Sequence, residues 1–128
     1  MSDDKTYEAG MELRRAMWGK AGADDRMAVA TDFNRPFEDL VTTYCFGDIW
    51  NRPGLDRKTR SMITLAALTA LSKPNQIKAH VAGAIANGVS KEEIREIIMH
   101  SAVYGGIPAG VEAMTAAQEV LKQMGLDK

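Results

Sequence analysis

Helix start and stop signals recur at short intervals along this chain, and they constrain its fold more than any other sequence feature. Ser90, followed three residues later by Glu93, has the pattern of a capping box, which opens a helix. Gly19 and the pair Asn87-Gly88 stand where helices are expected to end. Helix-forming residues dominate, and strict alternation of β-branched residues is rare. The sequence therefore predicts an all-α fold.

These signals divide the chain into six or seven helices with short connections. Hydrophobic residues make up 45% of the 128 residues, which is enough for a core without a disulfide or metal. We therefore expect a compact bundle that forms a single domain over residues 1–128. The expected helices cover roughly 4–18, 34–50, 56–71, 73–87, 91–104 and 108–124, with a short irregular segment or small helix at 21–32.

Two of these helices carry informative apolar patterns. Residues 62–71 are apolar nearly all round, which is typical of a helix that is central or buried in an oligomer. The helix expected over 34–50 has a one-sided stripe, typical of a face that packs on a core. The stripe consists of Phe37, Leu40, Val41, Tyr44 and Cys45.

Composition excludes several classes of function. The net charge is −1 without a basic patch, so we expect no nucleic-acid partner. The apolar stretch 62–71 is too short to cross a bilayer, and the acidic start of the chain is unlike a secretory signal, so we expect a cytoplasmic protein. A single cysteine, Cys45, excludes an intrachain disulfide and a cysteine-rich metal site. With two histidines in the chain, we predict no metal centre.

His80 is the sharpest candidate for chemistry. Its helix is expected to bury Ile77, Val81 and Ala84, which places the imidazole at an apolar face. An imidazole there can act as a general acid or base, because its ordinary pKa lies near neutrality. The alternative is a core histidine that bonds a backbone carbonyl. His100, near the end of its helix, is expected to meet the helix dipole and is given no site role.

Asp48 and a basic cluster are the other candidates. Asp48 extends the apolar stripe by one turn, and the alternative is a solvated carboxylate or one paired with Arg52. A substrate with two carboxylates would need planar guanidinium groups such as those of the cluster. The alternative for the cluster is a solvated helix start. Its members are Arg52, Arg57, Lys58 and Arg60.

Several stretches taken together carry a family resemblance. The pieces Gly47-Asp48-Ile49-Trp50-Asn51-Arg52-Pro53-Gly54-Leu55 and Arg57-Lys58-Thr59-Arg60-Ser61 are the most specific, and 7–15, 80–89, 92–94 and 102–109 match as well. With them the chain resembles the carboxymuconolactone decarboxylase family almost from end to end. The resemblance implies an alkylhydroperoxidase D-like fold and a homo-oligomer, with a hexamer favoured.

The resemblance also implies a reaction. It is the cofactor-independent conversion of 4-carboxymuconolactone, a lactone dicarboxylate, to 3-oxoadipate enol-lactone and CO2, a step of protocatechuate catabolism in the β-ketoadipate pathway. No metal or organic cofactor is implied. Family members often carry Glu where this chain has Asp48, which is shorter by one C–C bond of about 1.5 Å.

The wider superfamily includes thiol peroxidases with a Cys-x-x-Cys-x-x-x-His signature. Aligned on His80, this chain has Lys73 and Gln76 at the two cysteine positions, and Ser61 where a proton-relay glutamate falls. Because peroxide reduction needs a thiolate nucleophile, we expect no peroxidase activity of that kind.

Roles can be assigned to the candidates as hypotheses. His80 delivers a proton to the carbanion left by CO2, and Asp48 orients the imidazole or helps to desolvate the departing carboxylate by repulsion. Arg52 or Arg60 binds the retained carboxylate. The expected pocket walls are Tyr44 and Trp50.

Two alternatives stay open at this point. One is a decarboxylase or hydrolase for a related lactone, because a fold does not fix a substrate. The other is a non-enzymatic helical oligomer that serves as a binding module. The joint presence of His80, Asp48 and the basic cluster argues against the binding module, which has no need for them together.

Overall fold

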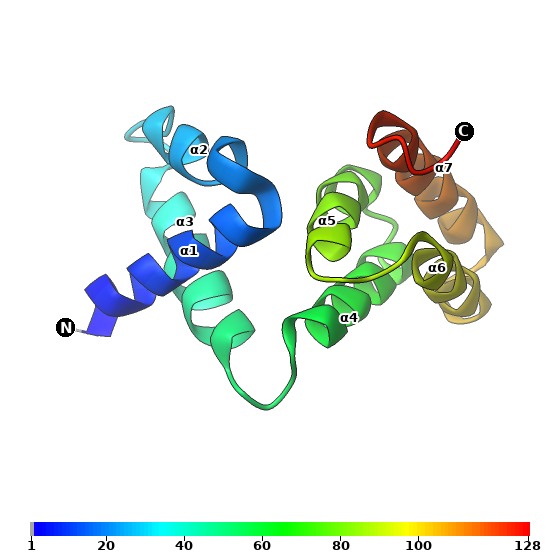
Figure 1. Cartoon of the computed structure of the whole chain (residues 1–128), viewed down its shortest axis with the longest axis horizontal. Helices are drawn as coiled ribbons and strands as arrows, with labels where there is room; N and C mark the ends of the chain where they lie inside the picture. Colours follow the sequence, from blue (N-terminus) through cyan, green and yellow to red (C-terminus); the bar gives the residue numbers. More distant parts are fainter. Residues whose placement is uncertain (1) are drawn as a thin grey trace. The chain divides into compact units, whose positions relative to one another are not determined.

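The structure is a computed structural model that describes residues 2–128, with side chains from Asp4 onward, and it consists of helices throughout this range (Figure 1). The all-α prediction is therefore confirmed, with seven α-helices in the described residues. The α-helices are α1 (Ser2–Gly22), α2 (Asp24–Ala28), α3 (Arg35–Leu40), α4 (Arg57–Ala70), α5 (Pro74–Ala86), α6 (Lys91–Gly105) and α7 (Ile107–Gln123).

Between α3 and α4 the helical path changes its pitch. A π-helix, η1 (Val41–Asp48), continues directly from α3, and a 3₁₀ turn, η2 (Ile49–Asn51), follows it. The sequence predicts one continuous α-helix here, and this is wrong in detail. A π-helix of this length is rare, and such wide turns often mark functional sites.

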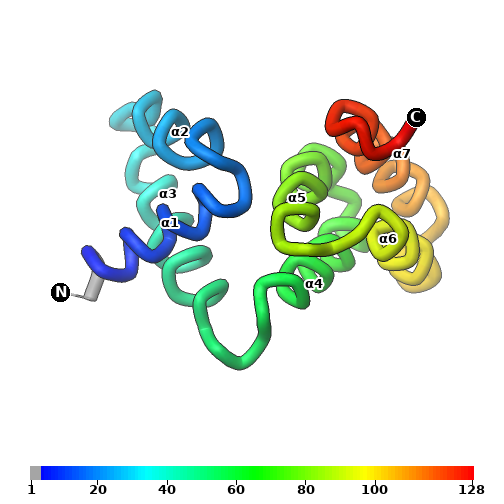
Figure 2. Tube along the Cα trace, viewed as in Figure 1, coloured from blue at the N-terminus to red at the C-terminus, as the bar shows by residue number. Residues whose placement is uncertain are grey.

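The chain forms two compact units, which we describe separately. The N-terminal unit ends at Arg57, and the C-terminal unit begins at Lys58. Figure 2 shows the N-terminal unit in blue to blue-green and the C-terminal unit in green to red.

The C-terminal unit follows the sequence signals closely. Ser90 caps α6 through its side chain, and Glu93 returns a bond to the Ser90 backbone, so the predicted capping box is confirmed. Gly88 and Gly106 adopt positive φ angles of 93° and 103° at the ends of α5 and α6, a conformation that favours glycine. The helix boundaries in this unit are therefore set by local chemistry that the sequence displays.

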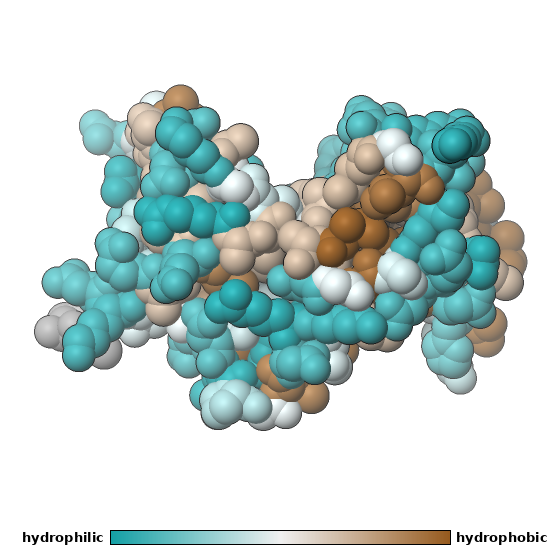
Figure 3. All heavy atoms as spheres, viewed as in Figure 1, coloured by the Kyte–Doolittle hydropathy of each residue, from teal (hydrophilic) through white to brown (hydrophobic). Residues whose placement is uncertain are grey.

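An apolar core joins the four helices of this unit. Leu65, Ile77, Val81 and Ile94 are at most 1% exposed, and small residues of α7 complete the cluster. Apolar residues gather between α5 and α7 on the face seen in Figure 3. Helix α4 buries only one side, because Ile63 remains 52% exposed. The expectation that α4 is central is therefore not met within a single chain.

In the N-terminal unit, α1 packs against η1 at very close range. A Cβ atom on Gly10 would lie 2.0 Å from the carbonyl oxygen of Thr42, and one on Gly47 would lie 2.1 Å from that of Thr6. Glycine is needed at both positions because two helical backbones meet there. The predicted break of the first helix at Gly19 is confirmed, because Gly19 leaves helical geometry at φ 71°.

A buried ion pair lies at the centre of this unit. Arg14 and Glu38 are 4% and 6% exposed, and both terminal guanidinium nitrogens of Arg14 lie 3.5 Å from Oε1 of Glu38. Arg14 also donates to the Thr42 hydroxyl at 2.8 Å, and Arg26 reaches Glu38 from the solvent side at 3.3 Å. These bonds tie α1, α2 and α3 to the first turn of the π-helix.

The ion pair explains why one face prediction is wrong. The stripe expected to pack on a core is largely exposed, with Phe37, Leu40 and Tyr44 at 63%, 55% and 60%. The buried face instead carries Glu38 and Thr42, because their polar groups are satisfied by Arg14 and so can leave water. Phe37, Leu40 and Tyr44 are consequently at the surface of the single chain, whereas Val41 and Cys45 are partly buried against the apolar cluster around Leu13.

Candidate functional site

The predicted site residues divide between the two units. Tyr44, Asp48, Trp50 and Arg52 belong to the N-terminal unit, at and just after the π-helix η1. Arg60 on α4 and His80 on α5 belong to the C-terminal unit. The candidates therefore form two groups, one in each unit.

Asp48 is the last residue of η1, and Arg52 follows the 3₁₀ turn. Their side chains are 54% and 65% exposed, with Nη1 of Arg52 3.9 Å from Oδ1 of Asp48. The pairing that the sequence left open as an alternative is confirmed. A long, exposed pair of this kind contributes little to stability.

Tyr44 and Trp50 lie in contrasting environments. Tyr44 is 60% exposed on the outer face of η1. Trp50 is 7% exposed and packs in an apolar cluster with Leu13 and Phe46, whose ring centroid is 5.8 Å from that of Trp50. Trp50 therefore supports the fold of the N-terminal unit, while Tyr44 presents an aromatic face to solvent.

Asn51 is a residue of this group to which the sequence analysis assigned no role. Its side-chain amide donates to the carbonyl of Phe46 at 2.9 Å, and at 3.4 Å to the carbonyls of Gly47 and Ala9. Its oxygen accepts from Nη2 of Arg57 at 3.2 Å. The sequence does mark this position, because Asn51 begins the turn that leads to Arg52. An Asn in a turn is normally explained by its preference for turn conformations, which does not indicate the contacts of its side chain.

His80 lies on the side of α5 that adjoins the core, as predicted. Its neighbours Ile77, Val81 and Ala84 are completely buried, and the imidazole is half-buried with its Nδ1 atom shielded from solvent. Loss of hydration lowers the pKa of His80 to about 4, because burial penalises the charged ring. The imidazole is therefore neutral near pH 7 in the free protein.

Arg60 is half-buried at the start of α4, and its Nε atom is shielded from solvent. The next residue, Ser61, is 1% exposed and accepts a hydrogen bond from the amide of Asn87 at 3.0 Å. A neutral pair thus occupies the position at which the resemblance places a relay glutamate in thiol peroxidases. This arrangement offers no carboxylate to carry a proton there.

Cys45 does not provide a substitute nucleophile. Burial raises the pKa of its thiol, so the neutral form dominates near pH 7. The positions of the two signature cysteines hold Lys73 and Gln76. Thiolate chemistry is therefore not supported by the residues that the structure describes.

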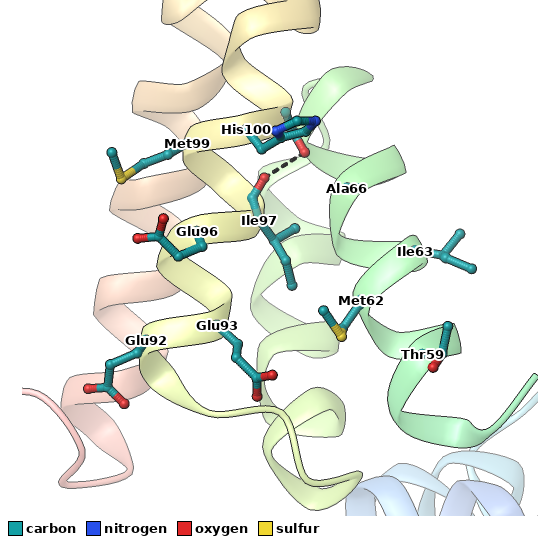
Figure 4. Close-up of a pocket in the computed structure, with 11 residues that line it drawn as sticks. Thr59, Met62, Ile63, Ala66, Glu92, Glu93, Glu96, Ile97, Met99 and His100 are labelled. Atoms are coloured by element: carbon teal, nitrogen blue, oxygen red, sulfur yellow. Dashed lines mark hydrogen bonds between the residues drawn. The ribbon is translucent and has the colours of Figure 1, made fainter.

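A large groove that none of these candidates lines runs between α4 and α6 (Figure 4). Its volume is about 850 Å³, and its floor is apolar, with Met62 and Ile97 between the two helices. Glu92, Glu93 and Glu96 line it, together with His100. None of the residues that line this groove is Lys or Arg, so it offers an anionic metabolite no ammonium or guanidinium partner.

Within the part of the chain that the structure describes, no group of three or more His, Cys, Asp or Glu side chains could hold a metal ion. None of the described helices combines the length and the apolar character needed to span a membrane.

Comparisons with known proteins agree with these observations. The chain is 36% identical over 126 residues to the 4-carboxymuconolactone decarboxylase of Acinetobacter baylyi, covering 98% of this chain and 94% of the relative. It is 38% identical over 120 residues to the nitrosuccinic acid decarboxylase of Metarhizium robertsii, covering 94% and 84%. An uncharacterized 15.0 kDa protein of Paracoccus denitrificans is 44% identical over 96 residues, covering 67% of this chain and 71% of the relative. Residues 35–119 match the model of the carboxymuconolactone decarboxylase family, and the chain belongs to this family.

Proposed function

We propose that this protein decarboxylates 4-carboxymuconolactone to 3-oxoadipate enol-lactone and CO2, and that it does so in the cytoplasm. The observation that carries the proposal is the 36% identity, over 98% of the chain, to a 4-carboxymuconolactone decarboxylase. The half-buried imidazole of His80 and the exposed guanidinium of Arg52 suit an anionic substrate that must be protonated on carbon.

The substrate supplies its own electron sink. One saturated ring carbon bears the departing carboxylate and a carboxymethyl group. When its bond to CO2 breaks, the electron pair delocalises through the ring C=C into the lactone carbonyl. A proton then adds to the carbon next to that carbonyl, which gives the enol-lactone. The protein has to orient the carboxylate, stabilise the oxyanion and deliver the proton.

The roles of the candidate residues are part of this proposal. His80 donates the proton. Asp48 either orients the imidazole or helps to desolvate the departing carboxylate by repulsion. Arg52 or Arg60 binds the retained carboxymethyl group, since a guanidinium matches a carboxylate with two parallel bonds. Tyr44 and Trp50 are the proposed walls of the pocket, with Tyr44 presenting its exposed ring and Trp50 only the small part of its side chain that its apolar cluster leaves exposed.

His80 can deliver a proton only if substrate binding leads to protonation of its imidazole. The imidazole is neutral in the free protein, with a pKa of about 4. A dianionic substrate beside the ring favours the imidazolium and raises this pKa. Binding is therefore coupled to proton uptake, which calorimetry with a non-reacting dicarboxylate lactone in buffers of different ionisation enthalpy would detect. Binding without proton uptake near pH 7 would contradict this role.

Nitrosuccinic acid is a second candidate substrate, favoured by the 38% identity to a nitrosuccinic acid decarboxylase over 94% of the chain. Both compounds contain a succinate skeleton in which the carbon that loses CO2 also bears an electron-withdrawing group. In nitrosuccinate the nitro group accepts the electron pair as a nitronate. The same arginines and the same proton donor would suit either compound.

A direct comparison of the two substrates decides between them. Initial rates of CO2 release would be measured with 4-carboxymuconolactone and with nitrosuccinate under the same conditions. We expect kcat/KM to be higher for the lactone by about tenfold or more, which corresponds to about 1.4 kcal/mol of transition-state binding. A preference for nitrosuccinate would reassign the substrate, and no release of CO2 from either would reject the decarboxylase proposal.

We further propose that the protein is a homo-oligomer, with a hexamer as the expected state. Large apolar side chains remain exposed on both units, among them Phe33 at 95% and Tyr104 at 80%. Contiguous exposed apolar patches are typical of surfaces that bind another protein. Native mass spectrometry would give the number of subunits, and a monomer at micromolar concentration would contradict the proposal.

A further inference from the structure

We propose that Asn51 is a positioning residue that holds the segment from Asp48 to Arg52 in place, and that Arg57 fixes the orientation of the Asn51 amide. The activity test of this inference rests on the proposed function, because it takes Asp48 and Arg52 as groups that meet the substrate. The anchoring itself is a property of the N-terminal unit alone.

The need for an anchor arises where the π-helix ends. Carbonyl groups in the last turn of a helix lack the next backbone N–H as a partner. The chain turns away after η2, because Arg52 is extended at φ −67° and ψ 140°. The Asn51 side chain donates to the carbonyls of Phe46 at 2.9 Å and Gly47 at 3.4 Å, which lie in the last turn of η1.

The same amide also reaches α1. Its contact with the carbonyl of Ala9 at 3.4 Å lies beside the close approach of Gly10 to η1. A single half-buried amide thus joins the end of η1 to the helix on which η1 packs. Motion of the Asp48 backbone away from α1 would break these contacts.

Arg57 determines which end of the amide faces these carbonyls. Its Nη2 donates to Oδ1 of Asn51 at 3.2 Å, so the oxygen points to the guanidinium and the nitrogen to the three carbonyls. In the reverse orientation, the N–H groups of the amide would face those of the guanidinium, and the amide oxygen would face the carbonyl oxygens. Arg57 therefore differs in role from Arg52 of the same basic cluster. Arg57 holds the Asn51 side chain, whereas the side chain of Arg52 is 65% exposed.

The consequence for the site is geometric. Asp48 lies three residues before Asn51 and Arg52 directly follows it, and their side chains form a pair of 3.9 Å at the surface. Both side chains move with the backbone segment that Asn51 holds. A small displacement of groups that meet a substrate slows catalysis strongly.

The test uses two variants that remove the donor in different ways. Asn51→Ala removes the whole amide, whereas Asn51→Asp keeps the shape and the acceptor for Arg57 but loses the N–H groups. Hydrogen exchange of the backbone amides in residues 46–52 would be followed by mass spectrometry. We expect both variants to exchange at least about fivefold faster in this segment, with exchange in the C-terminal unit unchanged.

Activity then separates positioning from general support of the fold. We expect either variant to lower kcat/KM by about tenfold in the wild-type background, but by less than about threefold when Asp48→Asn is already present, because coupled residues are not additive. Asn34→Ala is the matched control. It removes an exposed side-chain bond to the Thr31 backbone in the same unit and should change neither readout.

The possible outcomes are distinct. Unchanged exchange in residues 46–52 would overturn the inference whatever the activity. Faster exchange with unchanged kcat/KM, or equal losses in the two backgrounds, would leave Asn51 as a helix cap without a positioning role. If the wild type releases no CO2 from either proposed substrate, the proposed function has failed, and the exchange result still decides whether Asn51 anchors the segment.

Discussion

The two units of this chain are stabilised in different ways. The C-terminal unit has one continuous apolar cluster to which all four of its helices contribute, with Leu65, Ile77 and Ile98 almost fully buried. The N-terminal unit has two smaller apolar clusters and a buried ion pair, Arg14 with Glu38. The comparison teaches that one chain can combine a core formed by apolar periodicity with a core organised by polar contacts.

The largest expected effect comes from breaking the ion pair. Arg14→Met should destabilise the protein by about 3–5 kcal/mol, because Glu38 would stay buried without its buried partner and with the exposed Arg26 on its solvent side. Urea unfolding at fixed protein concentration would measure it. The double variant Arg14→Met with Glu38→Leu should lose less, since no uncompensated buried charge remains. A single variant within 1 kcal/mol of the wild type, on the order of a surface substitution, would contradict the comparison.

The apolar core of the other unit gives the next effect. Ile98→Ala removes buried methyl groups from α6, at a residue that is 1% exposed, and should cost about 2–4 kcal/mol. Ile98→Val is the graded control, with an expected loss of about 1 kcal/mol. Urea unfolding of the wild type and the two variants would measure both losses of stability. Equal stability of Ala and Val at this position would indicate that the core is not tightly packed.

These two predictions also show which parts of the molecule follow from its sequence. The capping box at Ser90 and the turn at Gly88 are local signals, so the helices of the C-terminal unit could be placed in advance. Burial of Glu38 in place of Phe37 could not, because it depends on Arg14, which lies 24 residues earlier in the sequence. Apolar periodicity assumes that polar side chains face water, and the buried pair breaks this assumption.

The candidate site divides in the same way. The helix and the apolar surroundings of His80 were predictable from Ile77, Val81 and Ala84. The contacts of Asn51 were not, because they arise at the end of a π-helix, for which the sequence pattern gives no signal. Pairing of Asp48 with Arg52 was one of two alternatives, and only the structure distinguishes them.

A smaller effect concerns the pH dependence of stability. Burial holds the pKa of His80 at about 4 in the folded state, below the ordinary value of 6.5. The unfolded chain therefore binds a proton more readily as the pH falls through this range, and the folded state loses stability relative to it. Wild type should lose on the order of 1–3 kcal/mol relative to His80→Gln between pH 6.5 and pH 4. Parallel stability profiles of the two proteins would contradict the burial of this imidazole.

The smallest effect is expected at the surface of the N-terminal unit. Arg35 and Asp39 form an exposed pair at 3.0 Å on α3. Arg35→Ala should leave the urea midpoint unchanged within error, because solvent screens such a pair. A loss comparable to that of Arg14→Met would show that ion pairs stabilise this unit regardless of burial, which would remove the basis of the comparison.

The most direct test of the central claim is the turnover of 4-carboxymuconolactone by the wild type and by His80→Gln, with the oligomeric state of both verified. His100→Gln is the control, because His100 is the second histidine and lines the acidic groove. We predict that His80→Gln lowers kcat by about 10²-fold or more, whereas His100→Gln retains wild-type activity. A His80→Gln enzyme within a few-fold of the wild type would contradict the assignment of His80 as the proton donor.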